Sequence, residues 1–193
     1  AYDIMTKNYG NPSSLHKMGY DASLALDNAR EVIAKSVGAE PKEIYFTSGG
    51  TEANNLAVMG TVNAKKRNGN KIVTTAIEHP SVLETMKVLE ERGFNVVYIK
   101  PENGVIPLSA LENEIDKDTI LVSVMTVNNE TGLVTPTEKI PAIIKKNNSK
   151  AIFHTDFVQG YGKLNCKVKK IGCDLLTVSS HKVHGPKGVG ALY

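Results

Sequence analysis

Residues 175–193 read LLTVSSHKVHGPKGVGALY, and this stretch does most to indicate the fold. An apolar run from Leu175 to Val178 precedes a glycine-punctuated loop that contains Lys182, and a second apolar run follows from Val189 to Tyr193. Short apolar runs bounded by glycine and proline are typical of buried strands. A lysine in a loop between two such strands can act as an amine nucleophile that forms a Schiff base with a carbonyl.

Two other loops supply the partners that such a lysine needs. Residues 47–52 read TSGGTE, where glycines permit close backbone approach and the first N–H groups of a following helix attract a phosphate. Residues 154–159 read HTDFVQ, where Asp156 ends an apolar run and needs a charged partner if it is buried. Together the three segments indicate a site for pyridoxal phosphate (PLP), with Asp156 beside the protonated pyridine nitrogen.

Strand and helix patterns alternate along the whole chain. We expect helices at about residues 20–37, 51–66, 80–92, 108–115 and 136–147. We expect strands at residues 44–47, 71–75, 95–99, 119–125, 151–155 and 174–179. Short β-branched strands separated by helices favour an α/β fold, a three-layer αβα arrangement around a mostly parallel, mixed sheet. We find no repeat or linker, so we expect a single domain over residues 1–193.

The candidate site residues follow different strands of this sheet. Gly50 and Thr51 follow one strand, and His79, Asn129, Asp156 and Lys182 each follow another. In open α/β sheets, ligands bind beyond the carboxyl ends of the strands. We therefore expect residues that are far apart in the sequence to meet in one crevice.

Composition excludes several other classes of protein. With 41% hydrophobic and 22% charged residues the chain has ordinary globular usage, and a net charge of +3 is too small to indicate nucleic-acid binding. No apolar run is long enough to span a membrane. The two cysteines, Cys166 and Cys173, indicate a reducing compartment, and we expect a cytoplasmic protein. Their spacing matches no zinc motif, so we expect buried structural thiols and no metal site.

Six motifs occur in a fixed order: residues 10–14 (GNPSS), 47–52 (TSGGTE), 78–79 (EH), 127–132 (VNNETG), 156–159 (DFVQ) and 179–188 (SSHKVHGPKG). Together they closely resemble the NifS-like cysteine desulfurases, in the class-V branch of the fold-type-I PLP enzymes. The resemblance covers essentially the whole chain. The segments 127–130 and 185–188 resemble the NifS/IscS group, because the SufS-like group more often has threonine where Lys187 stands.

The resemblance implies a role for each candidate residue. Lys182 would hold PLP covalently, and His79 would stack on the ring and move protons. Asn129 would contact the substrate or a ring oxygen. The phosphate and the ring would be bound by Gly50, Thr51, Ser179, His181, Asp156 and Gln159.

Simpler interpretations stand beside these roles. Thr51, His79 and Asp156 could each cap a helix or the next segment, and an Asn-Asn pair is often only a turn. A lone lysine is usually a solvated surface charge, and Lys187 exemplifies that case.

The resemblance also implies an activity. Family members convert L-cysteine to alanine and pass the sulfur as an enzyme persulfide to an iron–sulfur scaffold or another acceptor protein. Their catalytic cysteine and a substrate-binding arginine lie in a C-terminal half. We therefore expect residues 1–193 to be the PLP-binding large domain of a homodimeric enzyme without its small domain, and to be inactive alone. Alternatives are a class-V aminotransferase, a selenocysteine lyase, or a non-catalytic domain that binds partners.

Overall fold

The computed structural model describes residues 2–147 and 149–193, so that Ala1 and Asn148 lie outside the description. The chain divides into two compact units, one that ends at Ile44 and one from Tyr45 to Tyr193. The first unit holds α1 (Tyr2–Thr6), α2 (Lys17–Val37) and the 3-10 turn η1 (Pro41–Glu43). Helix α2 ends at Gly38, whose φ of 71° suits a residue without a side chain.

The second unit is built on one sheet of seven strands in the order β1-β7-β6-β5-β4-β2-β3. Its strands are β1 (Tyr45–Thr47), β2 (Lys71–Thr75), β3 (Asn95–Ile99), β4 (Thr119–Ser123), β5 (Ile152–Asp156), β6 (Leu175–Ser179) and β7 (Gly190–Leu192). Strands β2 to β6 pair in parallel, whereas β7 runs antiparallel to both β1 and β6. The sheet is therefore mixed, as predicted.

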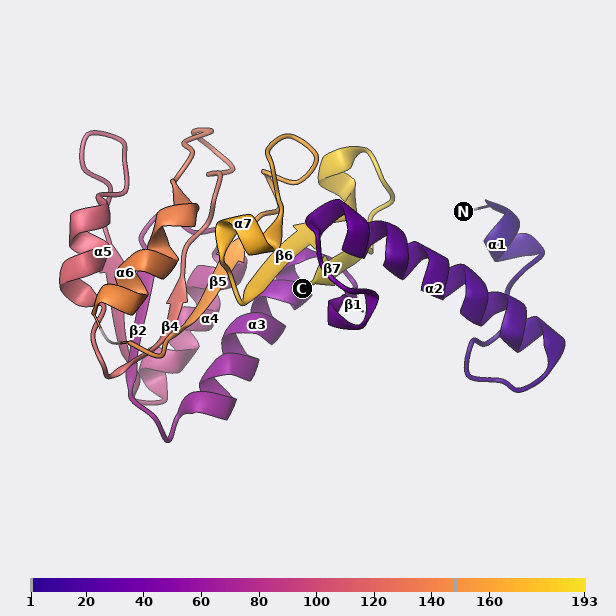
Figure 1. Ribbon diagram of the computed structural model, residues 1–193, viewed down its shortest axis with the longest axis horizontal. Helices are drawn as coiled ribbons and strands as arrows, with labels where there is room; N and C mark the ends of the chain where they lie inside the picture. The colour runs from indigo at the N-terminus through magenta and orange to yellow at the C-terminus, as the bar shows by residue number, and fades with distance from the viewer. Residues whose placement is uncertain (1, 148) are drawn as a thin grey trace. The chain divides into compact units, whose positions relative to one another are not determined.

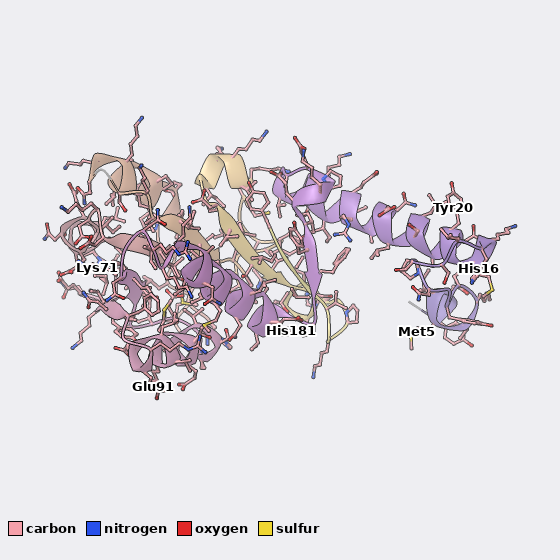
Figure 2. The ribbon with its side chains drawn as sticks, turned by 90° about the horizontal axis from the view of Figure 1, so that it is seen from below. Met5, His16, Tyr20, Lys71, Glu91 and His181 are labelled. Atoms are coloured by element: carbon pink, nitrogen blue, oxygen red, sulfur yellow. The ribbon has the colours of Figure 1, made fainter. Side chains whose placement is uncertain are left out.

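Helices cover both faces of this sheet. They are α3 (Gly50–Lys65), α4 (Pro80–Glu91), α5 (Leu108–Glu114), α6 (Ile140–Lys146) and α7 (Val168–Ile171), with the 3-10 turns η2 (Thr137–Lys139) and η3 (Ser180–Val183). Figure 2 shows α3 and α4 on one face, with α6 and α7 on the other. This three-layer arrangement confirms the predicted αβα fold class.

The packing explains why these segments form these elements. Every residue of β4 is buried, because the strand is covered on both faces, and its sequence is accordingly almost continuously apolar. Helix α4 buries Val82, Met86 and Leu89, at the spacing of one helical face. These side chains join one hydrophobic core with residues from α3, β2 and β4.

Most strands and helices lie within a few residues of their expected positions, and two short α-helices were not expected. Helix α1 lies where no helix was expected, and α7 lies in a stretch that was assigned no structure. Both are too short to show a periodic apolar face. No helix among residues 2–147 and 149–193 is long and apolar enough to cross a membrane. The single-domain interpretation of residues 1–193 stays a prediction.

Candidate active site

The predicted site residues meet at one edge of the sheet in the second unit. Figure 1 shows that the segments after β4, β5 and β6 leave the sheet on the same side. Parallel strands place their carboxyl ends together, which brings distant loops into contact. A cavity of about 200 Å³ opens there, and it is lined by Gly50, Thr51, Asn54, His79, Ser81, Met125, Asn129, Asp156, Val158, Gln159, Ser179, His181 and Lys182. Every residue predicted for the site is among them.

Gly50 and Thr51 begin α3 directly behind β1, at one wall of the cavity. A Cβ atom added to Gly50 would lie 3.0 Å from Cγ2 of Val158 and 3.6 Å from Cβ of Ser179. A larger residue would therefore narrow the cavity at this wall. The free N–H groups at the start of a helix carry partial positive charge, which suits an anionic group such as a phosphate.

Ser179 and His181 form the neighbouring wall. Ser179 ends β6 and is buried, and its Oγ lies 2.9 Å from Nδ1 of the more exposed His181. The loop beyond them is compact, because the N–H of Gly185 donates to the carbonyl of Ser180 at 3.0 Å. This turn holds Lys182 in η3 at the cavity.

Lys187, the second lysine of this loop, does not line this cavity. It lines an adjoining hollow that shares Gly50, Thr51, Ser179 and His181 with the cavity described above. Lys182 lines the cavity itself and Lys187 does not. The assignment of Lys182, and not Lys187, as the lysine that holds the cofactor stays a prediction.

Asp156 presents a buried carboxylate to the cavity. Its Oδ1 accepts a hydrogen bond from the N–H of Val158 at 2.9 Å, and its Oδ2 accepts one from Nδ2 of Asn54 at 2.7 Å. Burial raises the pKa of Asp156, and these two hydrogen bonds and the nearby His79 act in the opposite direction. No lysine or arginine forms an ion pair with Asp156 within the described residues. The site therefore suits a ligand that brings a positive charge.

His79 caps α4 and faces the cavity at the same time. Its Nδ1 accepts from the N–H of Ser81 at 3.1 Å and lies 2.8 Å from Oγ of Ser81. Both the capping role and the site role considered for this histidine are therefore compatible with its position. Ser81 in turn accepts a hydrogen bond from Nδ2 of Asn54 at 2.9 Å.

Asn54 and Ser81 were not predicted as site residues, although the sequence contains a signal for them. Asn54 lies on the buried face of α3 with Ala53, Ala57 and Val58. Ser81 lies on the buried face of α4. A polar residue at a position where the helical period places apolar ones indicates a buried partner, since an unpaired polar group there is costly.

Glu78 is a further buried acid behind the cavity. Its Oε1 accepts from Oγ1 of Thr75 at 2.6 Å and from the N–H of Met125 at 2.9 Å. Burial raises the pKa of Glu78 to about 8, so the side chain is mostly a neutral carboxylic acid at pH 7. The sequence analysis noted Glu78 as part of a motif but assigned it no role.

The two adjacent asparagines have separate roles. Asn128 builds the turn: its Oδ1 accepts from the N–H groups of Glu130 and Thr131, and its Nδ2 donates to the carbonyl of Ile77. Asn129 lines the cavity instead. The interpretation of the pair as a turn thus applies to its first member, and the contact of Asn129 with a substrate or cofactor stays a prediction.

Cys166 and Cys173 are buried and lie outside the cavity, as expected for structural thiols. Burial raises the pKa of both, that of Cys173 to about 12. Neither is activated as a nucleophile. In the described part of the chain, no group of three or more His, Cys, Asp or Glu side chains could hold a metal ion.

The residues present fit PLP. The helix start at Gly50 and Thr51 with Ser179 and His181 offers donors for a phosphate, and the buried Asp156 carboxylate lacks a cationic partner that a pyridinium would provide. When bound, PLP supplies an electron sink that stabilises negative charge on an attached amino acid.

Comparison with known proteins agrees with the interpretation of the cavity as a PLP site. The model of the family "Aminotransferase class-V" matches residues 2–193. The chain belongs to the class-V aminotransferase family. A mitosomal cysteine desulfurase of Trachipleistophora hominis is 50% identical over 97% of this chain and 43% of its own length. The mitochondrial cysteine desulfurase of Saccharomyces cerevisiae is 46% identical over 96% of this chain and 37% of its own length.

Relatives within the NifS/IscS group confirm the predicted resemblance. Cysteine desulfurase IscS of Buchnera aphidicola is 44% identical over 100% of this class-V chain and 48% of its own length. A solved structure described as a NifS-like protein superposes with a TM-score of 0.95 at 43% identity, covering 100% of this chain and 53% of that one. A second, described as SspA in complex with cysteine, has a TM-score of 0.93 at 40% identity, with 99% and 55% covered. The chain thus spans about half the length of the proteins it matches.

Proposed function

We propose that this chain is the PLP-binding part of a cysteine desulfurase, which converts L-cysteine to L-alanine and retains the sulfur as an enzyme persulfide. The observation that carries the proposal is the convergence of every predicted cofactor-binding residue on one cavity beside Lys182. The identity to cysteine desulfurases supports the reaction class.

Different residues of the cavity would bind different parts of the cofactor. Gly50, Thr51, Ser179 and His181 bind the phosphate, and Asp156 pairs with the ring nitrogen and keeps it protonated. Lys182 is the amine to which the cofactor attaches.

The remaining residues act on the ring and the substrate. His79 would stack on the ring and assist proton movement, while Asn129 and Gln159 would orient polar atoms of the ring or the substrate. Such positioning contributes to rate because a misplaced substrate reacts far more slowly.

The sulfur-accepting thiol in this proposal is neither Cys166 nor Cys173. Attack on the substrate sulfur requires an accessible thiolate, and both of these thiols are buried with raised pKa values. The acceptor thiol therefore comes from another segment of the enzyme. The persulfide sulfur then passes to an acceptor protein, for which we propose an iron–sulfur scaffold.

We further propose that the enzyme is a homodimer, as fold-type-I enzymes build their sites beside a subunit boundary. We expect residues 10–12 to lie close to that boundary, and the large side chains of Tyr2, Met5, Tyr9 and Leu15 around this segment are exposed. Light scattering that shows a monomer for the full-length protein would contradict the proposal. The cytoplasmic location stays a prediction, which fractionation of the source cells can test.

The attachment of PLP to Lys182 is the direct test of the proposed function. Protein loaded with PLP is reduced with borohydride and digested, and the labelled peptide is mapped. We expect the label on Lys182, its loss in Lys182→Ala and its retention in the control Lys187→Ala. Label on Lys187, or label spread over surface lysines, would refute the assignment. Three activities of the full-length enzyme are then compared: turnover of L-cysteine, turnover of selenocysteine, and transfer of an amino group to a 2-oxo acid. The fastest of the three distinguishes a desulfurase from a selenocysteine lyase or an aminotransferase.

A further inference from the structure

Two buried side chains, Asn54 on α3 and Ser81 on α4, connect Asp156 to His79. Nδ2 of Asn54 donates one hydrogen to Oδ2 of Asp156 at 2.7 Å and the other to Oγ of Ser81 at 2.9 Å. Oγ of Ser81 lies 2.8 Å from Nδ1 of His79. All four residues line the same cavity.

The direction of every bond in this chain follows from one backbone group. The N–H of Ser81 can only donate, and it points at Nδ1 of His79 at 3.1 Å. Nδ1 is therefore an acceptor and carries no proton, so the 2.8 Å contact from Ser81 requires the serine hydroxyl to donate as well. The hydroxyl oxygen is then free to accept from Asn54.

The direction of the hydrogen bond at Asp156 is determined in the same way. Because Asn54 presents its NH₂ group to Ser81, that group also faces Asp156, whose Oδ2 must accept. An accepting oxygen favours the ionised carboxylate, against the effect of burial. At the other end, a neutral His79 ring whose Nδ1 is unprotonated carries its proton on Nε2.

We propose that Asn54 and Ser81 are positioning residues that hold His79 in its Nε2–H tautomer and Asp156 as a hydrogen-bond-accepting carboxylate. Nε2 then presents its proton to a group in the cavity as a hydrogen-bond donor and does not release it. The use of that proton in turnover rests on the proposed function, whereas the tautomer does not. If His79 only capped α4, the backbone N–H of Ser81 would be sufficient, and the Ser81 hydroxyl would not affect the tautomer.

The tautomer can be read directly by NMR of protein labelled with ¹⁵N at histidine. The experiment uses the full-length protein, in which His79→Gln identifies the resonances of His79. His154 is an internal reference, because burial lowers its pKa to about 3 and keeps it neutral. We expect the His79 Nδ1 resonance in the acceptor range and the Nε2 resonance in the proton-bearing range.

Variants of α4 separate positioning from capping. Ser81→Ala removes the hydroxyl donor at 2.8 Å and leaves only the 3.1 Å bond from the backbone N–H to hold Nδ1 as an acceptor, so the second tautomer should become partly populated and the His79 resonances should move toward each other. Ser81→Thr retains a hydroxyl and should restore the wild-type pattern. Thr85→Val is the matched control, because it removes another buried hydroxyl of α4, which bonds Asn55 Oδ1 and the carbonyl of Ser81.

Activity of the full-length enzyme gives the second readout. Loss of one preorganised hydrogen-bond donor in an active site costs about 10²–10³-fold in kcat, so Ser81→Ala, which loosens this donor, should lower kcat by about tenfold or more and leave KM nearly unchanged. A proton on Nδ1 in the wild type, or identical spectra for wild type and Ser81→Ala, would overturn the proposal. A changed tautomer with unchanged kcat would overturn the positioning role, whereas failure of Lys182 labelling would overturn the proposed function instead.

Discussion

Oε1 of Glu78 accepts a hydrogen bond from the N–H of Met125 at 2.9 Å, and this bond ties the segment after β2 to the segment after β4. The carboxyl group is buried, and its Oε2 atom has no hydrogen-bond partner within the described residues. A charged carboxylate is costly in such surroundings, which is why burial raises the pKa of Glu78 to about 8. In its protonated form Glu78 adds no charge near Asp156, whose own charge also raises the pKa of Glu78.

This burial predicts a pH dependence of stability that Glu78→Gln should remove. Between the ordinary carboxyl pKa of 4.5 and the folded value of about 8, the native state binds a proton that the unfolded state has lost. The contribution of Glu78 to the free energy of unfolding is therefore full below about pH 4.5 and falls as pH rises toward 8, by up to about 1.4 kcal/mol per pH unit. Denaturant unfolding of both cofactor-free proteins at pH 5, 6, 7 and 8 measures the difference. Parallel curves would show that Glu78 is ionised in the native state.

Asp156→Asn should weaken PLP binding strongly. The amide keeps the shape of the side chain but cannot neutralise a protonated pyridine, and removal of one partner of a buried ion pair costs about 3–5 kcal/mol, or at least about 100-fold in affinity. Absorbance titration with PLP measures the loss and any shift of the cofactor spectrum. Asp174→Asn is the control, since Asp174 accepts from the N–H of Phe153 at the other end of β5. Unchanged affinity and spectrum for Asp156→Asn would remove the basis for this pairing.

Gly190→Ala should destabilise the fold, because β7 passes very close to the start of α3. A Cβ atom at residue 190 would lie 2.7 Å from the carbonyl carbon of Gly49 and 2.9 Å from Oγ1 of Thr47. Overpacking of this kind costs about 1–3 kcal/mol. Gly60→Ala on α3 is the matched control, because its added Cβ meets no atom within 4 Å and should stabilise the helix by about 1 kcal/mol. Equal melting temperatures for Gly190→Ala and wild type would show that the strand moves aside without cost.

Cys166 and Cys173 should react slowly with thiol reagents in the native state and should not support sulfide release. Both are buried, and with a pKa of about 12 Cys173 is almost wholly the unreactive thiol at pH 8. The rate with an aromatic disulfide reagent, with and without denaturant, measures their access. Sulfide and alanine from residues 1–193 with PLP and L-cysteine should stay far below those of the full-length enzyme. Comparable turnover would show that one of these thiols serves after all.

The order and type of the main elements could be read from the sequence, because they depend on local patterns. The periodic apolar face of α4 and the central apolar run of β4 can be recognised from residues that are close together in the sequence. The positions of Asp156, His79 and Lys182 after their strands then followed from the rule that parallel strands end at one edge. The site residues could therefore be predicted as a group before their contacts were known.

The contacts themselves depend on packing between residues that are distant in the sequence. Asn54 and Asp156 are 102 positions apart, and no local pattern encodes their bond. The same holds for the burial that raises the pKa of Glu78, because the covering atoms come from other strands and helices. Local sequence thus specifies backbone conformation and exposed chemistry, whereas hydrogen-bond direction, protonation and tautomer arise when the folded chain excludes water from these groups.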